Sequence, residues 1–154
     1  AIIIGVIYIV LYLGSAYASR NSYRLANIAG GEQAGSNLLW KVVFIIYVAL
    51  IPLLFFKYYY IAVAGFILLA LIQNFWRPML ISRFDDFASE TQGATILSIE
   101  SQVKSVSTMI VAPIMGVMVD LLIKRNLGGE FWPVAALAAV IALFAIMTSA
   151  KQKS

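Results

Sequence analysis

The chain has 154 residues, of which 62% are apolar and 12% charged, whereas soluble domains carry about 45–50% apolar and about 25% charged residues. This number of charged residues is too small to cover a water-facing surface. The composition therefore largely excludes a soluble enzyme and predicts a membrane protein. The absence of cysteine and histidine excludes disulfide bonds, thiolate nucleophiles and metal ligation by these groups. The net charge of +4 is too small and too scattered to predict a nucleic-acid partner.

Five apolar runs of 17 to 30 residues are predicted to cross the membrane as helices, since a bilayer requires about 20 residues per span. They are residues 2–18, 38–56, 59–81, 94–123 and 131–149. Residues 1–154 are therefore expected to form a single all-α bundle in the lipid bilayer. Because the chain opens on Ala1 inside an apolar run, we also expect it to be a fragment of a longer protein.

Polar or glycine-bearing stretches connect these runs, at residues 19–37, near Lys57, at 82–93 and at 124–130. The segment 31–37 is interpreted as a turn and helix start, with Ser36 or Asn37 as the N-cap. It lacks the spacing of a phosphate-binding loop, so ATP hydrolysis by this chain is unsupported. The acidic residues between the third and fourth runs lack histidine and a recurrent spacing, so neither a metal nor a cofactor is expected.

The fourth run, 94–123, is the least hydrophobic, yet its helical pattern predicts a spanning helix. At about 100° per residue, small residues fall on one stripe and branched apolar residues on the opposite one. The small-residue stripe consists of Ala94, Ser98, Ser101, Ser105, Thr108, Ala112 and Gly116. Since small residues let helices approach closely, this stripe is predicted to face other helices or a water-filled cavity.

Basic residues near the predicted helix ends indicate the orientation in the membrane. With the carboxyl terminus inside, Arg20, Arg24, Lys41, Arg77, Arg83, Lys151 and Lys153 lie on or near the cytoplasmic side, against Lys57, Lys124 and Arg125 outside. This asymmetry favours a cytoplasmic carboxyl terminus. We expect a multi-pass protein of a bacterial-type inner membrane or a plasma membrane.

Glu100 and Lys104 are the main candidates for residues of a transport pathway. They stand one helical turn apart with the acid first, which is the favourable order for an ion pair. At the centre of a spanning helix each alone would cost about 2.5–3.5 kcal/mol. Glu100 could bind a proton or a cationic substrate while Lys104 tunes its charge; alternatively, the two form a structural ion pair, or Glu100 lies in water at the cytoplasmic mouth.

Amide and aromatic side chains provide further candidates. Gln73 and Asn74 in the third run could hydrogen-bond a substrate, although buried amides more often join helices. Tyr12, one turn from Tyr8, could line the pathway or pack against its neighbours, and packing is the favoured interpretation.

Residues 74–120 carry three features in a fixed order: Pro78 and a polar connection, an A-T-x-x-S-x-x-S motif at 94–101, and a P-x-x-G-x-x-x-D motif at 113–120. This order resembles the tenth and eleventh helices of major facilitator superfamily transporters. By topology the chain then corresponds to helices eight to twelve of a twelve-helix, two-bundle protein. Two departures stand out: Gly93 replaces an arginine common in the family, and only five of twelve spans are present.

The resemblance implies secondary active transport of a small solute by alternating access, as an ion-coupled symporter or antiporter. It also implies a partner, the missing amino-terminal half of the transporter. The expected pathway residues are Glu100, Lys104, Asn74, Gln73 and Tyr12, chosen for their polarity and depth.

A second hypothesis from another class is a membrane subunit or scaffold that transports nothing. A stable obligate partner would favour the scaffold, whereas thermal stabilisation by a substrate would favour the transporter. An intramembrane enzyme is disfavoured, because Glu100 would have to act with no obvious second catalytic group.

Overall fold

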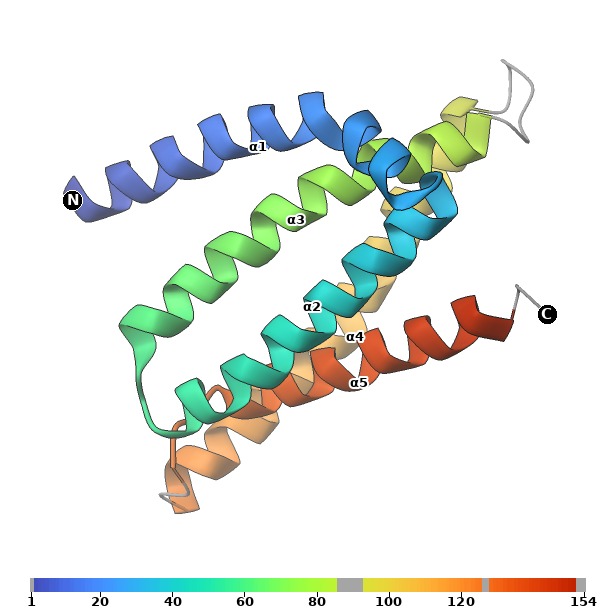
Figure 1. Ribbon diagram of the computed structural model, residues 1–154. Helices are drawn as coiled ribbons and strands as arrows, with labels where there is room; N and C mark the ends of the chain where they lie inside the picture. The colour runs from blue at the N-terminus through green and yellow to red at the C-terminus, as the bar shows by residue number, and fades with distance from the viewer. Residues whose placement is uncertain (1, 86–92, 126–127, 152–154) are drawn as a thin grey trace.

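The computed structural model describes residues 2–85, 93–125 and 128–151. This part of the chain contains five helices and no strand: α1 (Ile2–Ala29), α2 (Glu32–Phe55), α3 (Tyr59–Asp85), α4 (Gly93–Arg125) and α5 (Trp132–Lys151). Successive helices alternate in direction (Figure 1). The predicted all-α fold class is confirmed for these residues.

Four of the helices are long and apolar enough to cross a membrane, over Glu32–Phe55, Tyr59–Met79, Leu97–Arg125 and Trp132–Ser149. They match the last four predicted runs and support an integral, multi-pass membrane protein. The first run, 2–18, lies in α1, which does not meet the same measure over its described residues. Its passage through the bilayer therefore stays a prediction.

The predicted polar connection at 19–37 is almost entirely helical in the structure. No glycine or proline interrupts the chain between Gly14 and Gly30, and polar side chains bond to carbonyls of their own helix. Asn21 Nδ2 donates to the Tyr17 carbonyl and Ser22 Oγ to the Ser19 carbonyl, each at 2.9 Å. The helix consequently continues through this polar stretch to Ala29.

A two-glycine turn joins α1 to α2. The N–H groups of Gly30 and Gly31 donate to the carbonyls of Asn27 and Ala26 at 3.2 and 2.8 Å. Gly30 and Gly31 have φ angles of 89° and 117°, which favour glycine. Gly31 is also the N-cap of α2, without a side-chain cap, so the prediction of a cap at Ser36 or Asn37 is wrong.

Two apolar clusters hold α1, α2, α3 and α5 together. Ala26, Leu39, Ile72 and Met79 form one, where α1, α2 and α3 meet. Leu50, Leu54, Ala62 and Ala135 form the other, where α2, α3 and α5 meet. α4 passes behind α2 and α5 (Figure 1), and none of its apolar window is buried.

The alternating directions define two ends of the bundle (Figure 1). The α1–α2 turn lies at one, here called the Gly30 end, together with the last turns of α3 and the start of α4. The α2–α3 turn and the α4–α5 turn lie at the other, called the Lys57 end. Residues late in α3 and early in α4 therefore come together at the Gly30 end.

Candidate functional site

A cleft of about 240 Å³ lies between α3 and α4. From α3 it is lined by Gln73, Trp76 and Arg77, which occupy positions i, i+3 and i+4 and so share one helix face. From α4 it is lined by residues at i, i+3, i+4 and i+7, again one face. These are Leu97, Glu100, Ser101 and Lys104. Two polar faces of otherwise apolar helices thus meet in one place.

The cleft lies toward the Gly30 end rather than at the middle of the bundle. The 33 residues of α4 span about 50 Å at about 1.5 Å per residue, which exceeds the hydrocarbon thickness of about 30 Å. Glu100 lies about 10 Å along the axis from Gly93 on the same scale. Glu100 is half-buried and Lys104 exposed, and both lie in the half of α4 nearer the Gly30 end.

Glu100 and Lys104 share this cleft without an ion pair between them. Among the described side chains, the only ion pair joins Lys57 and Glu130. The interpretation of Glu100 and Lys104 as a structural pair is therefore not supported, which fits the small gain that exposed ion pairs provide. Neither side chain has an ion-pair partner among the residues that the structure describes.

Trp76 forms a fixed part of the cleft wall. Its indole Nε1 donates to Ser36 Oγ of α2 at 3.0 Å. Its ring also meets Trp40 edge-on, with 5.6 Å between ring centroids and an angle of 72° between the planes, a favourable aromatic arrangement. These two contacts hold this part of α3 against α2.

Asn74 and Tyr12 lie outside the cleft. Asn74 Nδ2 donates to Ser15 Oγ at 3.0 Å and to the Ala70 carbonyl at 2.8 Å, so it joins α3 to α1. The reason is helical rotation, since one step along α3 turns the side chain by about 100° away from Gln73. Tyr12 is 74% exposed and stacks on Tyr8.

The structure thus brings together Gln73, Glu100 and Lys104 of the five predicted pathway residues. It adds Trp76, Arg77 and Ser101, which the sequence analysis had not selected as site residues. Helical spacing from Gln73 could have indicated Trp76 and Arg77, and spacing from Lys104 could have indicated Ser101. The pairing of these two faces required the fold.

A second cavity, of about 520 Å³, adjoins the cleft; we call it the apolar cavity. It lies between α2, α3 and α5, and most of its wall is apolar or aromatic. Its lining residues are Leu39, Trp40, Val43, Tyr47, Leu69, Ala70, Ile72, Gln73, Trp76, Ala138 and Ile141. Gln73 and Trp76 also line the cleft, so the two spaces share part of a wall.

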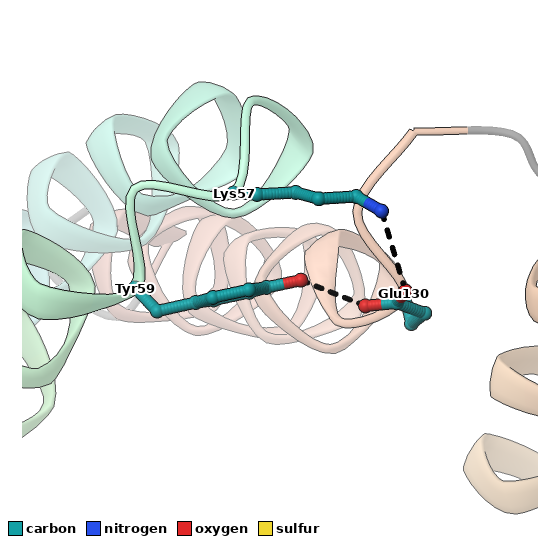
Figure 2. A network of polar contacts seen from close by, with 3 residues as sticks. All are labelled: Lys57, Tyr59 and Glu130. Atoms are coloured by element: carbon teal, nitrogen blue, oxygen red, sulfur yellow. Dashed lines mark hydrogen bonds and ion pairs between the residues drawn. The ribbon is translucent and has the colours of Figure 1, made fainter.

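Three side chains form a polar network at the Lys57 end (Figure 2). Tyr59 Oη donates to Glu130 Oε2 at 2.7 Å, and Lys57 Nζ lies 3.5 Å from Glu130 Oε1. The hydrogen bond from Tyr59, backbone hydrogen bonding and the charge of Lys57 hold the pKa of Glu130 below its ordinary value. The network connects the α2–α3 turn to the α4–α5 turn.

The backbone of these two turns is also closely fitted. Lys57, with φ at 61°, ends α2 in a left-handed conformation, and the Tyr58 N–H donates to the Leu53 carbonyl at 2.8 Å. The Gly129 N–H donates to the Phe55 carbonyl at 2.9 Å. A Cβ atom on Gly129 would collide with the Leu54 carbonyl, so only glycine fits there.

No family model, curated protein or solved structure matches the chain. Within the described residues, no group of three or more acidic, histidine or cysteine side chains could hold a metal ion. The resemblance to major facilitator superfamily transporters therefore rests on its sequence motifs.

Proposed function

We propose that the chain is part of a secondary transporter that moves a small solute by alternating access, coupled to an ion gradient. The observation that carries this proposal is the meeting of polar faces in one cleft, with Gln73, Glu100 and Lys104 together. Ionisable residues within spanning helices are costly and commonly mark substrate or ion pathways. A half-buried carboxylate on such a helix can take up and release a proton as the cleft opens and closes.

Each polar residue of the cleft has a distinct proposed role. Among the described lining residues Glu100 is the only carboxylate, which makes it the proposed proton-binding group. Gln73 supplies both a hydrogen-bond donor and an acceptor for the solute. Lys104, one turn beyond Glu100, supplies a positive charge to the same cleft.

The small-residue stripe of α4 supports a larger helical assembly. Its hydroxyls bond within the helix: Ser105 Oγ donates to the Ser101 carbonyl at 3.0 Å and Thr108 Oγ1 to the Lys104 carbonyl at 2.9 Å. The stripe is exposed in the described structure although small residues favour close helix packing. We propose that helices of the amino-terminal half of a twelve-helix transporter cover it.

The proposed orientation places the Gly30 end in the cytoplasm. Arg20 and Arg24 lie in the last turns of α1 and Arg77 late in α3, all toward this end. Basic residues accumulate on the cytoplasmic side of membrane proteins. The carboxyl terminus then lies in the cytoplasm and the cleft adjoins the cytoplasmic surface.

Flux measurements test the proposal. Vesicles from cells expressing the complete reading frame that contains this chain are loaded with a solute panel, with and without a proton gradient. Glu100→Gln is compared with Glu32→Gln, the same change at the start of α2 outside the cleft. We expect gradient-driven flux to be lost in the first variant and kept in the second, at matched expression.

Two other results would count against the proposal. Flux unchanged in Glu100→Gln would remove Glu100 as the coupling residue and reduce the cleft to a structural feature. No flux of any solute, together with a separate chain that copurifies in fixed ratio, would favour a non-transporting membrane subunit, with that chain covering α4.

A further inference from the structure

The apolar cavity and the cleft together have the form of an amphipathic site. The apolar cavity, of about 520 Å³, falls within the range of about 300–1,000 Å³ typical of small-molecule pockets. The two spaces adjoin at Gln73 and Trp76, which line both of them, so the proposed occupant reaches from one space into the other past these two side chains. Its apolar body would lie among Trp40, Val43 and Ile141, and its polar end would reach the cleft.

The charged residues of the cleft indicate whether the polar end of the occupant is anionic or cationic. Among the described lining residues, Arg77 and Lys104 contribute two positive charges and Glu100 contributes one negative charge. The guanidinium of arginine matches the planar, two-oxygen geometry of carboxylates, and lysine serves as a point charge for anions. A single anionic group therefore complements the cleft better than a single cationic group.

The shared wall is already ordered for such an occupant. Trp76 is fixed by its hydrogen bond to Ser36 and by its contact with Trp40. Binding therefore costs little conformational entropy on this side, which favours affinity. Gln73, one turn before Arg77, can donate a hydrogen bond to the same anionic group.

We propose that the chain binds a small, soluble amphipathic organic anion. Its apolar or aromatic body occupies the apolar cavity, and one carboxylate, sulfonate or phosphate group contacts Arg77, Lys104 and Gln73. This names the substrate class of the proposed transporter and rests on that function for transport, although binding itself does not require it. Glu100 lines the same cleft, and its negative charge opposes binding of the anion.

Matched probes test the charge preference. The chain in nanodiscs of zwitterionic lipid is titrated by calorimetry with 4-butylbenzoate, 4-butylbenzyl alcohol and 4-butylbenzylammonium, and the heats from empty nanodiscs are subtracted. These probes share one apolar body and differ in charge. We expect the benzoate to bind at least about tenfold more tightly than the other two, since a charged hydrogen bond is worth roughly that factor. Ammonium binding as tight as benzoate binding would overturn the proposal.

Substitutions separate the two parts of the site. Arg77→Gln should weaken benzoate binding about tenfold and leave the alcohol unchanged, whereas Glu100→Gln should strengthen it about threefold. Lys41→Gln removes a positive charge from α2 outside both spaces and should change neither. Ala138→Leu, which fills the apolar cavity, should weaken benzoate and alcohol alike. If Arg77→Gln does not fold, Lys104→Gln provides the same test, and unchanged benzoate affinity there would overturn the anion site.

Two further results identify the source of the anion and separate this inference from transport. Benzoate binding that survives in nanodiscs containing one-third anionic phospholipid supports a soluble solute, while displacement by that lipid would overturn it. If benzoate fails to bind but other solutes show Glu100-dependent flux, the inference fails and the proposed function stands. If benzoate binds as predicted and nothing is transported, the anion site stands and the proposed function fails.

Discussion

α4 and α5 both carry small residues at helical spacing, yet only α5 buries them. Ala135, Ala139 and Ala142 of α5 are 0%, 6% and 1% exposed, and Ala135 packs in a cluster with Leu50 and Leu54 of α2. The corresponding residues of α4 are exposed wherever the structure describes them. A stripe of small residues therefore shows that a helix is suited to close packing, whereas the position of its partner depends on the rest of the fold.

The turn before α5 should be more sensitive to substitution than the exposed stripe of α4. Gly129→Ala places a Cβ against the Leu54 carbonyl, which cannot move without disturbing the end of α2. We expect a loss of about 3 kcal/mol in the free energy of unfolding, measured by SDS titration in mixed micelles. Gly116→Ala on α4, whose Cβ would meet no atom within 4 Å, should instead stabilise by about 0.5–1 kcal/mol. Equal effects would contradict the difference between the two helices.

A larger side chain tests the two stripes directly. Ala135→Leu overfills the buried contact of α5 with α2, and we expect a loss of about 1–3 kcal/mol in the same titration. Ala112→Leu places the same side chain on the exposed stripe of α4 and should have little effect on this chain. If helices of the proposed transporter cover this stripe, Ala112→Leu should become disruptive in the complete protein, and that result would be evidence for a partner of α4.

A comparison of the two faces of α3 should give a smaller effect on stability. Asn74 bonds to Ser15 on the face toward α1, whereas Gln73 lines the cleft toward α4. A double-mutant cycle of Ser15→Ala and Asn74→Ala should show a coupling energy of about 0.6 kcal/mol, typical of hydrogen bonds between membrane helices. The same cycle with Gln73→Ala in place of Asn74→Ala should show no coupling to Ser15.

The Glu130 network should give the smallest effect and a characteristic pH dependence. Because the folded-state pKa of Glu130 is lowered, its contribution to stability is complete above the unfolded-state pKa of about 4.3. It is lost as the pH falls through the lower folded-state pKa. Thermal unfolding followed from pH 7 to pH 3 should show this acid-side loss in the wild type and a reduced loss in Glu130→Gln. An identical pH dependence in both proteins would show that the network does not stabilise the Lys57 end.

Much of the fold could be predicted because the bilayer imposes a simple length rule on apolar runs. The limits of α2, α3, α4 and α5 follow the predicted runs closely, apart from polar extensions such as residues 32–37 of α2. The helix at 19–29 was missed because polarity indicates only that a segment leaves the lipid. Asn21 and Ser22 are polar and helical at once, since their side chains bond to carbonyls of their own helix.

The site was less predictable than the helices. Gln73 and Asn74 were both predicted to be site residues because both are polar, although neighbouring residues of a helix point to different faces. Only the placement of α1 shows that Asn74 bonds to Ser15. Arg77 was counted for orientation and not for binding, because its location opposite Glu100 depends on how α3 and α4 pair. Long-range pairing of helices is the information that hydropathy and spacing do not contain.

The edge-on contact of Trp40 and Trp76 provides an intrinsic spectroscopic probe in the wall of the apolar cavity. Two indoles at this separation couple their electronic transitions, so their circular dichroism depends on the angle between α2 and α3. The third tryptophan, Trp132, lies against Phe55 and can be replaced by phenylalanine to leave only this pair. Movement of α3 against α2 could then be followed in the unlabelled chain as a spectral change.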